Sequence, residues 1–231
     1  MTGFFKDILS RIYATFIFED RYKFFLQGLG NTLILTIVSF VLGTIFGVIL
    51  CTMRRSSRKL LNQIARAITM LFVETPTMVL LMIMVYIIFG SSIIPVLPVI
   101  ALGLSLKAGA YLSEIFSTAL STVSEGEIEA ARTLGMSAFK AFRYVTLPQT
   151  VQRALPLYMN QFIVTMQETS VVGYLAVIDL TRASTIVSSR TMDSFFGIIA
   201  VTIIYFVIGF LAKKIFGLFM KDPLKKTEVS A

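Results

Sequence analysis

The distribution of uncharged stretches along the chain predicts a set of membrane-spanning helices. Thirty consecutive uncharged residues follow Lys23, and thirty-two follow Glu74. A helix needs about 20 apolar residues to cross a hydrocarbon core of about 30 Å. Gly90 and Pro95 interrupt the second stretch, which is therefore read as two spans joined by a short loop. We predict five transmembrane helices, at 26–53, 67–89, 96–120, 151–172 and 195–219.

The first 25 residues follow a different pattern, in which apolar and polar side chains occupy opposite faces of a helix. The polar face carries Lys6, Asp7 and Arg11. The apolar face consists of Phe4, Phe5, Ile8, Leu9, Ile12, Tyr13, Phe16 and Ile17. We expect the segment 1–25 to lie along the membrane surface as an amphipathic interfacial helix, ahead of a transmembrane domain at 26–219.

The composition agrees with an all-α integral membrane protein. The chain is 56% hydrophobic and 15% charged, whereas an average soluble domain is about 25% charged. Because the chain has no His, catalytic triads and zinc or haem sites that depend on His are excluded. Cys51 is the only cysteine, which excludes an intrachain disulfide and a multi-cysteine metal cluster. We therefore expect no catalytic residue, no metal site and no cofactor in this chain.

The net charge of +8 reports mainly on orientation. With five spans, the basic loop 54–66, the loop 124–148 and the C-terminal tail 220–231 share one side of the membrane. With Arg153, Lys213 and Lys214 at the adjoining helix ends, that side holds fourteen Lys and Arg residues, against six on the other. Basic residues gather on the cytoplasmic side of membrane proteins. The pattern predicts an outside N-terminus, a cytoplasmic C-terminus with a basic tail, and no nucleic-acid binding, because the basic residues flank spans rather than one groove.

The cytoplasmic loop 124–148 has the pattern of two short helices joined by a tight turn. Ser124 and Glu127 form a capping-box pattern at the start of the first helix. Gly135 occupies a C-cap position, where its tolerance of positive φ suits a turn. Ser137 begins a second short helix, which we expect to end before Pro148. The shape is that of a docking element, and an ordinary loop is the alternative.

These residues also resemble a known motif. The loop contains Glu129-Ala130-Ala131, then Gly135 after three residues, Val145 after nine more, and Leu147-Pro148 after one more. This spacing resembles the EAA loop of ABC-importer permeases. In that family Ile is more frequent at the place of Val145. Shorter matches resemble the polar amino-acid branch of that family: Gln27-Gly28-Leu29, Glu74-Thr75-Pro76, Ala110-Tyr111-Leu112-Ser113-Glu114 and Asn160-Gln161-Phe162.

The resemblance implies the transmembrane subunit of a type I importer in the bacterial inner membrane. It implies a second permease subunit, identical or different, two ATPase subunits and an external substrate-binding protein. ATP and Mg would bind the ATPases, and the absence of a GxxxxGK[ST] phosphate loop agrees with this. The residues implied in coupling to the ATPases are Glu129, Ala130, Ala131, Arg132 and Gly135.

Ionisable residues inside the spans are the candidates for a substrate pathway, since charges in hydrocarbon normally face a cavity or a partner. Lys107 and Glu114 are two helical turns apart on one face, and Glu168 lies in the fourth span. Both signs of charge suit a zwitterion such as an amino acid, while internal ion pairing is the structural alternative. Uncharged candidates are Tyr111, Asn160 and Thr169, for which helix–helix hydrogen bonding is the alternative. Glu74 is expected near the inner membrane surface.

Three functional classes follow from the sequence. ATP-driven import of a polar amino acid is the first, and import of another small solute, such as an opine or an amino-acid derivative, is the second. A passive channel or scaffold, whose helix pair only resembles the EAA loop, is the third. Gly43 and Gly47 also form a GxxxG pattern in the first span, which predicts close helix packing within or between subunits.

Overall fold

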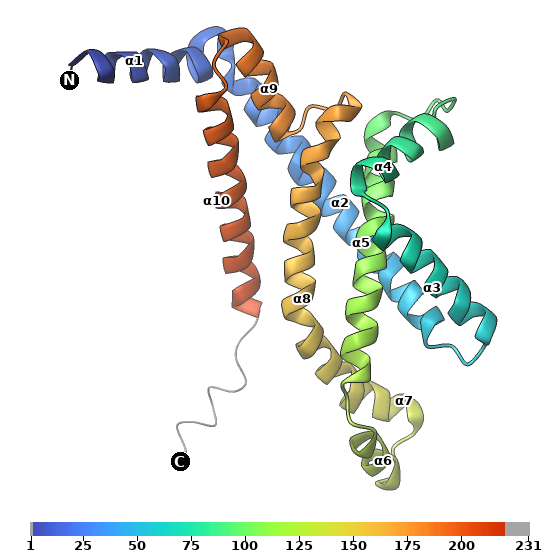
Figure 1. Cartoon of the computed structure of the whole chain (residues 1–231). Coiled ribbons are helices and arrows are strands. Elements are labelled where there is room, and N and C mark those ends of the chain that lie inside the picture. The colour runs from blue at the N-terminus through green and yellow to red at the C-terminus, as the bar shows by residue number, and fades with distance from the viewer. Residues whose placement is uncertain (1, 220–231) are drawn as a thin grey trace, which may run out of the picture.

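The computed structural model describes residues 2–219, and their regular secondary structure is entirely helical, with short loops between the helices (Figure 1). The expected tail 220–231 lies outside the described residues. In chain order the main elements are α1 (Thr2–Ile12), α2 (Tyr22–Arg54), α3 (Lys59–Glu74), α4 (Thr77–Met82), α5 (Val96–Ser121), α6 (Glu125–Thr133), α7 (Ala138–Ala141), α8 (Leu147–Glu168), α9 (Leu180–Thr191) and α10 (Phe195–Phe219). Short π or 3-10 segments join several of them: η1 (Tyr13–Ile17), η2 (Phe18–Asp20), η3 (Ile83–Ile88), η4 (Phe142–Thr146) and η5 (Thr169–Leu175).

Three unbroken helices are long and apolar enough to cross a membrane, namely α2, α5 and α10. They correspond closely to the predicted spans at 26–53, 96–120 and 195–219. Only 11% of the most apolar stretch of α10 is buried. Its remaining surface carries large exposed apolar side chains such as Phe206 and Phe210, which suits contact with lipid.

The other two predicted spans are bent pairs of helices. The α3–α4–η3 segment bends by 106° after Glu74, so the prediction of one straight helix at 67–89 is wrong. Pro76 explains the break, because proline restricts the preceding residue to an extended conformation and Thr75 has ψ 127°. The fourth span continues from α8 through η5, and a 46° bend separates it from α9.

The core of the fold is the crossing of α2 and α5. A Cβ atom placed on Gly47 would lie 2.9 Å from the carbonyl oxygen of Gly109, and one on Gly109 would lie 2.7 Å from the carbonyl oxygen of Gly43. Three glycines therefore let the two backbones touch. The close packing predicted from the GxxxG pattern is confirmed, and it occurs within one chain.

Two apolar clusters hold the remaining elements on this pair. One joins α4, η3 and η5 to α5 around buried Leu81, Leu104 and Val172. The other joins α9 and α10 to the start of α2 around Phe25 and Leu180. In Figure 1, α9 and the start of α10 lie at one end of the molecule, and α6 and α7 lie at the opposite end.

The predicted helix pair at 124–148 is present, with two corrections. The side chain of Ser124 makes no capping hydrogen bond, and Glu127 instead accepts a hydrogen bond from Gln149, so the capping box is not formed. The second helix also does not end before Pro148. It continues through the π-helical turn η4 into α8, and Pro148 lies directly after that turn without ending the helix.

The N-terminal segment is helical and projects away from the bundle (Figure 1). Phe5 and Leu9 of α1 are each 64% exposed. An ion pair of 3.4 Å between Arg11 and Asp193 ties this segment to the turn between α9 and α10.

Candidate functional site

The break between α3 and α4 leaves backbone carbonyl groups without helical partners. Side chains of α5 supply the missing donors: Lys107 Nζ donates to the carbonyl oxygen of Thr75 at 2.6 Å, and the Tyr111 hydroxyl donates to that of Val73 at 3.4 Å. A cation at the C-terminal end of a helix is also favoured by the helix dipole. The break and the two polar residues of α5 therefore form one site.

Glu168, the last residue of α8, completes this site. Its Oε1 atom accepts a hydrogen bond of 2.8 Å from the Thr77 hydroxyl and lies 4.0 Å from Lys107 Nζ. The side chains of Lys107 and Glu168 are only 5% and 16% exposed. Their opposite charges offset the cost of burial. The second carboxylate oxygen of Glu168 is buried and has no hydrogen-bond partner among the described residues. It is a buried acceptor whose hydrogen-bonding capacity is unused.

The structure thus brings together three of the predicted pathway residues, Lys107, Tyr111 and Glu168. The Lys107 ammonium also lies 5.9 Å from the centre of the Tyr111 ring, within the range of a cation–π contact. Thr77 was not predicted, although Glu74-Thr75-Pro76 contains the signal for a helix break beside it. A proline inside an apolar stretch exposes backbone groups that need polar partners from elsewhere.

Among the described residues, the other predicted pathway residues make no hydrogen bond or ion pair with Lys107, Tyr111 or Glu168. Glu114 is exposed and lies 3.5 Å from Arg54 Nη1, closer to the loop after α2. Thr169 is fully buried and its hydroxyl donates to the carbonyl oxygen of Met166 in the preceding turn. Asn160 is exposed on α8. Glu74 ends α3 at the break itself.

The helix pair at the opposite end of the molecule presents the EAA residues on its surface. Glu129, Ala130 and Arg132 are exposed, while Ala131 is buried against the rest of the chain. Gly135 has φ +85°, as predicted for the turn.

Two hydrogen bonds fix this turn: Gly135 N–H to the Arg132 carbonyl at 3.0 Å, and Met136 N–H to the Ala131 carbonyl at 3.2 Å. Both are the bonds of a Schellman motif. Ser137 then caps α7 by accepting a hydrogen bond from Lys140 N–H at 3.3 Å. The first helix is also held on α8 by the bond between Glu127 and Gln149.

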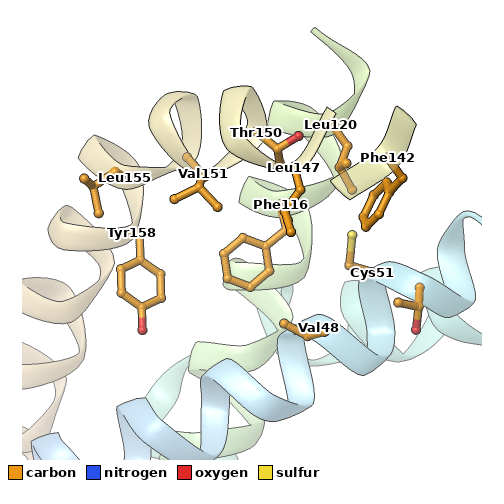
Figure 2. A pocket seen from close by; sticks show the side chains of 12 residues that line it. Val48, Cys51, Phe116, Leu120, Phe142, Leu147, Thr150, Val151, Leu155 and Tyr158 are labelled. Atoms are coloured by element: carbon orange, nitrogen blue, oxygen red, sulfur yellow. The ribbon is translucent and has the colours of Figure 1, made fainter. Parts of the chain in front are cut away.

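A separate apolar cavity of about 370 Å³ lies between α2, α5 and the η4–α8 segment (Figure 2). Val48 and Cys51 of α2 face Val151 and Leu155 of α8 across it, with Phe116 of α5 between them. The residues that line it do not include Lys107, Tyr111 or Glu168. It is therefore distinct from the polar site at the helix break.

A multi-span helical protein with a charge pair at a broken helix and an exposed helix pair at one end has the architecture of a membrane permease. Residues 39–222 match the family of binding-protein-dependent transport system inner membrane components, and the chain belongs to that family. It is a permease subunit in the inner membrane and not an enzyme. Family membership implies a binding protein and an ATPase as partners.

Individual relatives agree with the family assignment. The chain is 33% identical to the histidine/lysine/arginine/ornithine transport system permease protein HisM of Salmonella typhimurium, over 91% of this chain and 93% of that protein. It is 32% identical to the probable amino-acid permease protein YxeN of Bacillus subtilis, over 87% and 91%.

Solved structures show the same fold. The structure described as an amino acid ABC transporter with histidines matches with a TM-score of 0.79 and 33% identity, over 87% of this chain and 94% of that chain. The methionine ABC transporter MetNI, in inward-facing conformations, matches with a TM-score of 0.68 at 21% identity, which supports the fold alone.

Proposed function

We propose that this permease subunit moves a polar amino acid into the cell by alternating access, in a complex driven by separate ATPases. The observation that carries the proposal is the free oxygen of Glu168 beside Lys107 at the break between α3 and α4. A carboxylate and an ammonium in one buried site match the amino and carboxylate groups of an amino acid. The names of the relatives HisM and YxeN support the same class of substrate.

In this proposal Lys107, Tyr111 and Glu168 contact the substrate directly. Glu114, Asn160 and Thr169 line the pathway in other states of the cycle. The substrate competes with the contacts that the site makes with itself, since Lys107 already donates to Thr75 and Thr77 already donates to Glu168. Substrate binding at this site therefore alters the packing of α4 on α5 and α8.

At the other end of the molecule, α6 and α7 dock on the ATPases. Glu129 and Arg132 supply polar contacts, and Ala130 allows close approach. Ala131 packs the helix onto its own chain and Gly135 fixes the turn. ATP and Mg bind the ATPases, a second permease subunit completes the pathway, and a binding protein delivers the amino acid from outside.

The proposed orientation places the α6–α7 pair and the tail 220–231 in the cytoplasm. The N-terminus is outside, with the segment 1–25 lying along the outer membrane surface. The exposed apolar side chains of α1, among them Phe5 and Leu9, support contact with the bilayer. The residue range 26–219 forms the transmembrane domain.

The test is uptake by the complete complex reconstituted in vesicles, across a panel of amino acids and amino-acid derivatives. The proposal expects uptake of a polar amino acid that requires both ATP and the binding protein. Uptake confined to a derivative such as an opine supports the second functional class from the sequence. Equilibration of solute without ATP, by a chain that purifies without an ATPase, supports the passive channel and contradicts the proposal.

A further inference from the structure

The apolar cavity is a crevice between α2, α5 and the η4–α8 segment. The hydroxyl of its lining residue Tyr158 lies 3.0 Å from the Thr44 hydroxyl, and the rings of Phe40 and Tyr158 are 4.7 Å apart. Cys51 and Phe142 lie next to each other in the lining, and Phe142 belongs to the η4 segment that follows α7 (Figure 2). The volume of about 370 Å³ falls within the range of about 300–1,000 Å³ that is typical of ligand sites.

The lining of this crevice offers no free hydrogen-bonding side chain. Thr52 donates to the carbonyl oxygen of Ile49, and Thr150 donates to that of Thr146, both within their own helices. The Tyr158 hydroxyl is paired with Thr44. Water needs several polar partners to occupy a cavity. The crevice therefore suits a hydrocarbon chain rather than water or a polar solute.

Two basic residues are close in sequence to residues that line the crevice. Arg55 follows Cys51 by one helical turn, is exposed, and has no side-chain partner among the described residues. Arg153 precedes the lining residue Ala154, and its guanidinium donates only to neutral acceptors, the carbonyl oxygen of Thr122 and Oε1 of Gln149. In contrast, Arg54 is paired with Glu114. Two positive charges thus lie uncompensated beside an apolar crevice.

We propose that this crevice binds one acyl chain of an anionic phospholipid from the leaflet on the α6–α7 side, with the phosphodiester headgroup held by Arg55 and Arg153. Guanidinium groups recognise phosphate oxygens through charge-assisted hydrogen bonds. The bound chain lies against Cys51 and Phe142, so it fills the space between α2 and the segment that connects α6–α7 with α8. The site is separate from the polar site at the helix break.

The test is photo-crosslinking of the complete transporter in nanodiscs of phosphatidylcholine. In one sample, a small fraction of the lipid is phosphatidylglycerol with a photoactivatable group in one acyl chain. In the second sample, the same fraction is phosphatidylcholine that carries the same modified chain. Label is located by peptide mass spectrometry, and the exposed side chains of Ile203 and Phe206 in the uncharged part of α10 report general lipid contact. The expected result is label at 48–52 and 150–158 that is roughly tenfold higher with phosphatidylglycerol than with phosphatidylcholine, because each arginine near an anionic lipid strengthens binding several-fold.

Two variants separate the headgroup from the crevice. Arg55→Gln combined with Arg153→Gln should abolish the preference for phosphatidylglycerol, whereas Lys214→Gln on α10 should retain it. Ala154→Phe should lower the label in the crevice with both lipids, because the added ring fills the space. Equal labelling by the two lipids in the unmodified protein would overturn the proposal. So would a preference that survives the double variant, or an absence of label at 48–52 and 150–158 while Ile203 and Phe206 are labelled.

Discussion

The ammonium group of Lys107 donates a hydrogen bond of 2.6 Å to the carbonyl oxygen of Thr75, across the contact between α5 and the end of α3. The same ammonium lies 4.0 Å from Glu168 at the end of α8. One side chain thus joins three spans at the point where one of them is broken. A side chain in this position can influence both substrate binding and the arrangement of the helices.

Replacement of Lys107 by Ala should change transport kinetics more than assembly. The apparent affinity for substrate should fall about tenfold or more, equivalent to about 1.4 kcal/mol or more, since Glu168 then lacks its cation. The measurement is uptake against substrate concentration, together with the yield of assembled complex. Lys107→Arg, which retains the charge, should be affected less. Unchanged uptake kinetics in Lys107→Ala would remove this residue from the substrate pathway.

A β-branched residue at Gly135 should disrupt coupling without affecting membrane insertion. At φ +85° valine is strained by about 1–3 kcal/mol, whereas asparagine tolerates positive φ more readily. Gly135→Val should therefore reduce copurification of the ATPase and ATP-driven uptake, and Gly135→Asn should retain most of both. Equal copurification and equal uptake in the two variants would show that the backbone conformation at Gly135 does not determine coupling.

Reversal of the charge at Glu129 tests whether the exposed face of α6 contacts the ATPase. Glu129→Lys should abolish uptake and leave the amount of inserted protein unchanged. Glu125→Lys is the matched control, because Glu125 is exposed on the same helix but lies outside the EAA pattern. A similar loss in both variants would point to a general effect of charge on α6 rather than to a contact at Glu129.

The crossing of α2 and α5 should be intolerant of side chains at Gly47. In Gly47→Val the new Cβ would lie 2.9 Å from both the Gly109 carbonyl oxygen and Leu112 Cβ, and overpacking of this kind costs about 1–3 kcal/mol. We expect a lower thermal unfolding midpoint of the purified complex in detergent. Gly30→Val on the same helix has open space around the new Cβ and serves as control. Equal midpoints for the two variants would contradict this packing.

The sequence predicted the unbroken spans well because their boundaries depend on local features. The start of the helix predicted at 195–219 agrees with that of α10, since the charged residue Asp193 precedes an apolar stretch. The predicted capping box is absent because of a contact with a residue that is distant in the sequence. Gln149 on α8 hydrogen-bonds Glu127, and this contact replaces the local one. Local patterns cannot report such competition.

The candidate site could be predicted only in part from the sequence, because it too depends on contacts between distant residues. Lys107 and Glu168 were identified because charges are rare in apolar stretches, but their contact depends on how α5 and α8 pack. The break at Pro76 was underestimated because the residues on both sides are apolar enough to continue a span. Pro148 was overestimated as a helix end, because the helix continues past it after the π-helical turn η4.

The continuity of the helix through Pro148 has a mechanical consequence. From Ala138 to Glu168 the chain is helical without an intervening loop, a length of about 45 Å at 1.5 Å per residue. The proposed docking end and the charge pair therefore lie on one continuous helical segment. The π-helical turn η4, Pro148 and Pro156 lie within it, and such features bend a helix. A movement of the α6–α7 pair on the ATPase is therefore expected to reach Glu168 through a bent helix, without an intervening loop to absorb it.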